Sequence, residues 1–136
     1  VTEWLRENLP ERFRLKDEEE VTLTEYEKGK DLKYRIDVVV YDREEEEPVC
    51  VIDTKYKDHG RPKTGDISQM VGYAKSKGTS ETFLLYPSDL DEELDVTLDD
   101  VRVRNMTFSL DDDLQKNGED FLGALSKALG IPALSV

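Results

Sequence analysis

Two aspartates lie inside strongly apolar segments of the sequence, and a lysine follows the second of them two residues later. Asp37 interrupts the apolar run 33–41, and Asp53 interrupts the run 48–55, which ends in Lys55. Burying an unpaired carboxylate costs free energy, so a carboxylate in such a run usually pairs with a cation, binds a metal or lies at an opening. Asp37, Asp53 and Lys55 are therefore the candidate catalytic group.

These residue types suit the hydrolysis of a phosphodiester bond. Mg²⁺ prefers oxygen ligands and usually takes one or two carboxylates together with waters and substrate phosphate. Asp37 and Asp53 would supply the carboxylates, and the backbone carbonyl of Thr54 would add another oxygen, while the Thr54 side chain is expected to point to the other face of its strand. A bound metal polarises a phosphoryl group and acidifies a bound water. Lys55, on the same strand face as Asp53, could orient that water and offset developing charge.

A simpler interpretation is that all three are charged residues at strand ends, because D-x-K is a common tripeptide. The combination favours chemistry, since both segments are apolar and the two aspartates are 16 residues apart across a single expected turn.

The two segments that carry these residues are expected to be neighbouring strands. Residues 33–41 and 48–55 are nearly continuously apolar, as is typical of central strands that are covered on both faces. The acidic run 44–47 between them predicts a solvated turn, so the two strands form a hairpin.

The rest of the chain predicts helices packed on a mixed sheet. Residues 66–77 form the clearest helix, with Asp66 suited to cap its start, Gly78 suited to end it, and apolar residues at helical spacing between them. Residues 88–100 are expected to be a polar loop. The other expected elements are helices over 1–9 and 121–129 and strands over 20–27, 82–86 and 101–110. The order α-β-β-β-α-β-β-α predicts an α/β fold with a mixed sheet flanked by helices.

The length of 136 residues favours a single domain over residues 1–136. The charge balance makes general affinity for DNA unexpected. The chain has 19 basic and 32 acidic residues and a net charge of −13, whereas a generic DNA-binding surface is basic. Residues 53–77 depart from this pattern, with six basic and three acidic residues, so contact with nucleic acid is expected there. The acidity resembles that of proteins adapted to high salt, where charge is screened within roughly 3 Å at about 1 M, and a halophilic source is a hypothesis.

The single cysteine and the hydropathy pattern indicate the compartment. Cys50 excludes an intrachain disulfide and is expected to be a buried small hydrophobe, which favours a reducing cytoplasm. No apolar run approaches the roughly 18 residues that span a bilayer, so no membrane partner is expected. The first residues lack the pattern of a signal peptide, and because the chain begins with Val1 we expect it to be a domain taken from a longer protein.

Longer motifs around the candidate residues resemble a nuclease family. The sequence R-I-D at 35–37, followed by V-I-D-T-K-Y-K at 51–57, resembles the PD-(D/E)xK nuclease signature, with Ile36 in place of the proline. D-I-S-Q-M-V-G-Y-A at 66–74 and F-L-L-Y-P at 83–87 narrow the resemblance to the McrC family, the nuclease subunit of the 5-methylcytosine-specific restriction system. The resemblance covers roughly residues 33–110.

This resemblance implies a restriction-endonuclease-like fold and a metal-dependent deoxyribonuclease. The implied cofactor is Mg²⁺, with Mn²⁺ as the alternative, and the implied partners are DNA and a GTP-driven motor subunit of the AAA+ class. The chain has no Walker-type phosphate loop, which is consistent with a motor on another chain.

The resemblance also adds residues around the catalytic group. It makes Gln69 an active-site residue, whose amide could hold a phosphate or a metal-bound water, with Tyr73 one turn later as its support; the alternative is an exposed glutamine and a half-buried tyrosine. Many nucleases of this class use a glutamate from the first helix, for which Glu7 is preferred because it lies near the apolar stripe. The candidates for holding the DNA backbone, which could instead belong to a solvated loop, are Lys57, Arg61 and Lys63.

Two other functions remain open from the sequence. The chain could be a nuclease-like fold retained only for binding DNA or assembling a complex, or it could be a repair nuclease or junction resolvase. The intact Asp-Asp-Lys set favours an active enzyme. The oligomeric state is open, a homodimer included.

Overall fold

A six-stranded mixed sheet organises the chain in the computed structural model, which describes residues 1–23, 32–56 and 62–135, with the backbone alone for 18–23 and 32–35. The strand order is β1-β2-β3-β4-β6-β5. The first three strands form an antiparallel meander, β3, β4 and β6 run parallel, and β5 returns antiparallel to β6. The strands are β1 (Phe13–Leu23), β2 (Leu32–Asp42), β3 (Glu47–Thr54), β4 (Glu81–Tyr86), β5 (Asp95–Leu98) and β6 (Val101–Thr107).

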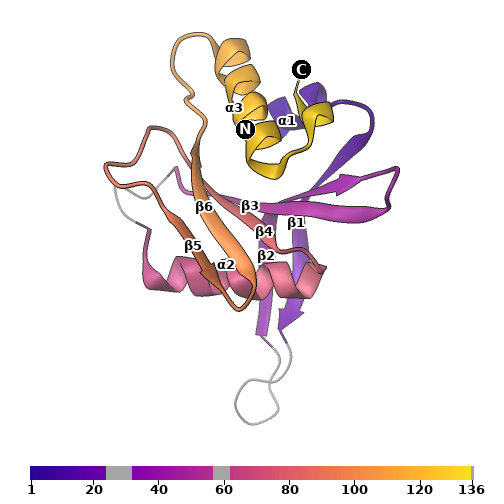
Figure 1. Ribbon diagram of the computed structural model, residues 1–136, viewed down its shortest axis with the longest axis vertical. Coiled ribbons are helices and arrows are strands. Elements are labelled where there is room, and N and C mark those ends of the chain that lie inside the picture. Colours follow the sequence, from indigo (N-terminus) through magenta and orange to yellow (C-terminus); the bar gives the residue numbers. More distant parts are fainter. Residues whose placement is uncertain (24–31, 57–61, 136) are drawn as a thin grey trace.

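Helices cover both faces of this sheet (Figure 1). On one face, α1 (Thr2–Asn8) and α3 (Leu114–Leu129), followed by the short 3-10 turn Pro132–Leu134, enclose a core with the strands. On the other face, α2 (Thr64–Lys77) packs Met70 and Ala74 into a second core. Within the described residues no helix is long and apolar enough to cross a membrane.

The buried central strands explain the apolar runs of the sequence. Residues 50–53 of β3 and 82–86 of β4 are all buried, because helices lie on both faces of these strands. The parallel pairing of β3 with β4 requires a crossover, and α2 provides it. The expected α/β fold with a mixed sheet is therefore confirmed, as are the β2–β3 hairpin and the buried Cys50.

The structure corrects several expected boundaries. The first strand begins at Phe13, well before residue 20, and residues 24–27 of the expected strand lie outside the described residues. The last helix begins at Leu114, since Asp113 caps it by accepting a hydrogen bond from the backbone N–H of Lys116. Its first turns are too polar to show a hydrophobic periodicity.

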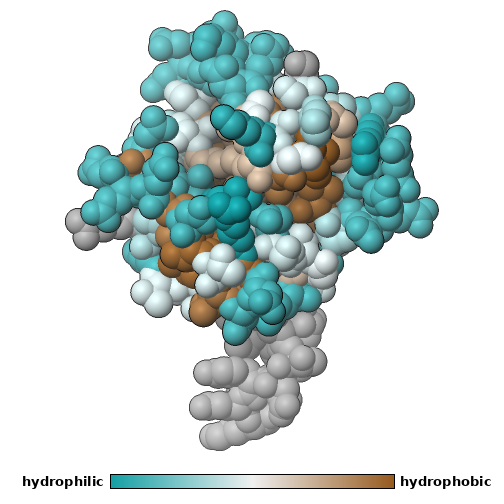
Figure 2. Space-filling view, in the orientation of Figure 1, coloured by the Kyte–Doolittle hydropathy of each residue, from teal (hydrophilic) through white to brown (hydrophobic). Residues whose placement is uncertain are grey.

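The predicted loop over 88–100 contains an additional strand, β5. All four of its residues are exposed, so the strand lacks the alternation of buried side chains that reveals strands in sequences. Among the strands that the structure describes, β5 pairs with β6 alone, which places it at an edge of the sheet. Val96 and Leu98 are exposed large hydrophobic residues on this strand. Figure 2 shows that brown, hydrophobic areas interrupt the hydrophilic surface of the face it draws.

The first and last helices pack through one close contact. Trp4 of α1 is buried, donates a hydrogen bond from Nε1 to Gln115 Oε1 at 3.1 Å, and meets the ring of Phe108 edge-on with centroids 5.5 Å apart. A Cβ placed on Gly118 of α3 would overlap the indole ring of Trp4. Glycine therefore stands at position 118 because the indole occupies the space of a side chain.

Replacing Gly118 and replacing Gly123 should have opposite effects on stability. Gly118→Ala should destabilise the fold by about 1–3 kcal/mol, since a rigid ring must shift to admit the methyl group. Gly123→Ala, in the same helix with nothing near its added Cβ, should stabilise it by roughly 0.5–1 kcal/mol through helix propensity. Denaturant unfolding of both variants checks this, and equal effects would contradict the proposed packing.

Candidate active site

The candidate carboxylates lie where β2 and β3 stop pairing. The last backbone pair between these strands is Val38 with Ile52, and continuing the same register would place Asp37 opposite Asp53. Directly opposed residues of an antiparallel pair project from the same face. Alternation along the two strands places both aspartates on the face that carries Val39 and Val51, which is the face covered by α2.

Asp37 takes the place of the missing backbone partner of β3. Its Oδ2 accepts two hydrogen bonds from Thr54, one from the backbone N–H and one from the hydroxyl, each at 3.0 Å. The expectation that the Thr54 side chain points away from the site is therefore wrong. The strands separate here, and the carboxylate of Asp37 fills the gap, so the hydroxyl of Thr54 turns toward it and fixes its orientation.

Lys55 lies between two carboxylates. Its Nζ is 2.8 Å from Asp53 Oδ2 and 3.1 Å from Asp66 Oδ1. The three side chains are largely shielded, with 13%, 10% and 16% of their surface exposed for Lys55, Asp53 and Asp66. The backbone N–H of Lys55 donates to Leu85 O at 2.8 Å, which anchors the residue just past the end of β3.

Asp66 is the member of this cluster that the sequence reasoning placed only as a helix cap. The helix begins at Thr64 and its N-cap is Lys63, so Asp66 lies in the first turn. Its Oδ2 accepts a hydrogen bond from the backbone N–H of Lys63 at 3.0 Å, while Oδ1 faces Lys55. The sequence did contain a signal for this position, an aspartate at the start of the helix that follows D-x-K. A crossover helix between parallel strands begins near the C-terminal end of the first strand, here β3.

Burial and like charge set the proton affinities in the cluster. Burial, with the nearby Asp37 adding to it, raises the pKa of Asp53 to about 6, although Lys55 opposes this shift. Burial alone would lower the pKa of Lys55, but its ion pairs with Asp53 and Asp66 raise that pKa above the ordinary value. Burial would also raise the pKa of Asp66, but hydrogen bonds from Lys63 and Lys55 outweigh it and lower that pKa.

The donor set suits a hard divalent cation. Asp37 lies beside Asp53, and Lys55 pairs with Asp53 and Asp66, so the cluster holds three carboxylates and one ammonium and negative charge is in excess. Among the described residues no group of three or more His, Cys, Asp and Glu side chains is arranged to hold a metal. A metal here would rest on Asp37 and Asp53, with the carbonyl of Thr54 as the proposed third oxygen, which matches the sparse protein ligation usual for Mg²⁺.

Of the three further candidates, Gln69 and Tyr73 lie on α2, whereas Glu7 lies on α1. Gln69 is half-buried on α2, three residues after Asp66 and therefore on the same side of the helix. Tyr73 is buried in the core beneath α2 rather than half-buried. Glu7 does not join the cluster: it is exposed on α1, which packs on the opposite face of the sheet, because Trp4 and Leu5 direct that helix toward α3.

Of the three candidates for DNA contact, only one can be placed. Lys63 is exposed at the start of α2, whereas Lys57 and Arg61 lie outside the described residues.

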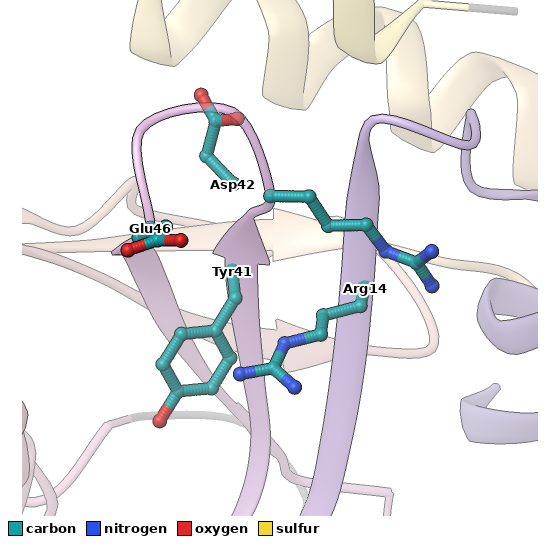
Figure 3. A pocket seen from close by; sticks show the side chains of 5 residues that line it. Arg14, Tyr41, Asp42 and Glu46 are labelled. Atoms are coloured by element: carbon teal, nitrogen blue, oxygen red, sulfur yellow. The ribbon is translucent and has the colours of Figure 1, made fainter.

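A separate pocket opens near the β2–β3 turn, where the hairpin strands are still paired. Its volume is about 670 Å³, and Figure 3 shows Arg14 beside the ring of Tyr41, with Glu46 and Asp42 nearby on the turn side. The guanidinium carbon of Arg14 is 5.0 Å from the Tyr41 ring centroid. Because the lining carries both signs of charge, it does not favour an anionic ligand.

The mixed sheet flanked by helices is consistent with an α/β fold of the restriction-endonuclease-like kind. The chain matches a chain of the refined half-complex from the tetradecameric assembly of Thermococcus gammatolerans McrB AAA+ hexamers with bound McrC, with a TM-score of 0.60 and 16% sequence identity. The match covers 89% of this chain and 30% of that one, so the chain spans under a third of that neighbour. No curated protein matches the sequence.

The family follows from the sequence itself. The family model described as McrBC 5-methylcytosine restriction system component matches residues 1–87. The chain belongs to this family, and the matched residues include Asp37, Asp53, Lys55 and Asp66.

Divalent metal should stabilise the fold through the two aspartates. Ligand at about 100 times its Kd adds about 2.7 kcal/mol, so saturating Mg²⁺ should raise Tm by a few degrees, and Asp53→Asn should abolish the rise. The rise should shrink as pH falls through about 6, because the raised pKa of Asp53 leaves its carboxyl protonated and unable to bind metal below that pH.

Thermal unfolding with and without Mg²⁺ measures this rise. Asp91→Asn, which removes the same charge from an exposed position, is the matched control and should behave as the unmodified chain does. An equal metal response in Asp53→Asn would exclude Asp53 as a ligand.

Proposed function

We propose that this chain is the nuclease domain of a modification-dependent restriction complex and hydrolyses phosphodiester bonds of DNA with Mg²⁺. The observation that carries the proposal is the cluster of Asp37, Asp53 and Lys55 where β2 and β3 stop pairing, in a chain of the McrBC family. The PD-(D/E)xK resemblance assigns the same three residues to catalysis.

Each residue of the cluster has a task in this chemistry. Asp37 and Asp53 would hold the ion, and Thr54 orients Asp37 through its hydroxyl and backbone N–H. A bound Mg²⁺ supplies a Lewis acid for the phosphoryl group and a more acidic water. Lys55, kept protonated by its carboxylate partners, offers an ammonium to the attacking water and to charge that develops on the phosphate.

Residues beyond the cluster would bind the substrate. Gln69 lies on the same side of α2 as Asp66, so its amide is suited to a phosphate oxygen or a metal-bound water. Tyr73, one turn later, is buried in the core beneath α2 and would support it. Lys57, Arg61 and Lys63 remain our candidates for the flanking DNA backbone. Their segment is the basic part of an otherwise acidic chain.

The proposed partner is a GTP-driven AAA+ motor on a separate chain. The structural neighbour comes from an assembly of McrB AAA+ hexamers with bound McrC, which supports such a partner here. Recognition of the modified base would then lie outside this domain. Family membership favours a restriction system over a repair nuclease or junction resolvase.

Removing the Lys55 ammonium should stop cleavage while leaving the metal response. Lys55→Ala removes one preorganised donor, which typically costs on the order of 100- to 1,000-fold in rate, but it removes no metal ligand. Asp53→Asn should lose both cleavage and the Mg²⁺-induced rise in Tm. The measurement is single-turnover cleavage of methylated DNA by the assembled complex with its motor and GTP.

Two results would contradict the proposal. Cleavage by the Lys55→Ala complex at the unmodified rate would remove Lys55 from catalysis. DNA binding without cleavage by the unmodified complex would favour a nuclease-like fold retained for binding or assembly.

A further inference from the structure

Lys55 depends on its partners for its position. A lysine has a flexible four-carbon stem and loses side-chain entropy when it is held in one place. The residue follows the last residue of β3, and its backbone N–H donates a hydrogen bond to Leu85 O. The ammonium is therefore fixed in space by the two carboxylates that it contacts, Asp53 and Asp66.

The two carboxylates do not have equivalent tasks. Asp53 is also a proposed metal ligand, and a divalent ion on its carboxylate would weaken its attraction for the lysine. Asp66 is on the helix, on the other side of Lys55, and is not among the proposed ligands. When metal is bound, Asp66 is therefore the carboxylate whose full charge stays available to the ammonium.

Asp66 is itself held firmly. One carboxylate oxygen accepts the backbone N–H of Lys63 at 3.0 Å, and its own backbone N–H donates to Lys63 O at 2.9 Å. The other oxygen is left to Lys55 at 3.1 Å. The first turn of a helix also stabilises negative charge, so the carboxylate stays ionised and fixed.

From this geometry we propose that Asp66 is a positioning residue that holds the Lys55 ammonium in place while Asp53 is engaged by metal. The inference rests on the proposed nuclease function. It assigns to α2 a task beyond covering the sheet: its first turn carries the counter-ion of the catalytic lysine. The substitution Asp66→Asn separates this task from helix capping, because the asparagine oxygen can still accept the Lys63 N–H while the charge is lost.

The test compares Asp66→Asn with Asp113→Asn in the assembled complex. Asp113 is a matched control: it also caps a helix start, through a hydrogen bond from Lys116 N, but in α3 on the opposite face of the sheet. Asp66→Asn should lower the single-turnover cleavage rate by about 10- to 100-fold, the range typical of residues that orient a ligand or catalytic group. The apparent affinity for DNA and the Mg²⁺-induced rise in Tm should not change, and Asp113→Asn should cleave at the unmodified rate.

A double substitution distinguishes positioning from a structural effect. In a Lys55→Gln background Asp66→Asn should cost no further activity, because Asp66 is proposed to act only through the lysine, and residues that act as a unit are not additive. An equal loss in both backgrounds, or unchanged cleavage by Asp66→Asn alone, would overturn the proposal.

A second measurement does not depend on cleavage, so it separates this proposal from the nuclease function. With Mg²⁺ bound, the rate at which an amine-acylating reagent modifies Lys55 is followed by mass spectrometry, with the exposed Lys75 as an internal reference. Asp66→Asn should accelerate the modification of Lys55 several-fold, and Asp113→Asn should not. An unchanged Lys55 rate would refute the positioning role even in a complex that cleaves, whereas an accelerated rate in a complex that never cleaves would refute only the nuclease function.

Discussion

The buried carboxylate of Asp53 is the constraint on which the neighbouring structure depends. Taking a charge out of water is costly unless it is compensated, and here a second carboxylate, Asp37, lies beside it. Lys55, just past the end of β3, supplies part of the compensation, and Asp66 completes the arrangement from α2. Clusters of this kind, in which burial and neighbouring charges shift the pKa of a carboxyl group, are typical of functional sites, and the proposed metal-binding task of Asp53 would account for its burial.

The sheet topology places Asp37, Asp53 and Lys55 at the end of β3. β3 stands between the antiparallel β2 and the parallel β4, so its two edges have different pairing patterns. On the β2 side the backbone pairing stops at Ile52, and the side chain of Asp37 satisfies the next N–H that faces it, that of Thr54. On the β4 side the pairing continues to Lys55. The end of β3 is therefore held by backbone pairing on its β4 edge and by the Asp37 side chain on its β2 edge.

The sequence predicted the parts of the molecule that leave a pattern in it. The apolar runs around Asp37 and Asp53 indicated buried strands, and their register across a single turn was enough to bring the carboxylates together. β5 was missed because none of its residues is buried, and the start of α3 was missed because its first turns are polar. The position of Asp66 at the helix start after D-x-K was a usable signal, but its contact with Lys55 depends on where the crossover helix docks. The contact of the Thr54 hydroxyl depends in the same way on where the hairpin opens.

The exposed edge strand β5 also bears on how copies of the molecule behave toward one another. An edge with apolar side chains such as Val96 and Leu98 is a template for pairing with another edge. The segment 91–100 around it contains six aspartates and glutamates and no lysine or arginine, so two such edges would repel each other on approach. That repulsion is screened by salt, which makes ionic strength, rather than the burial of the strand, the factor that governs edge-to-edge association in concentrated solution.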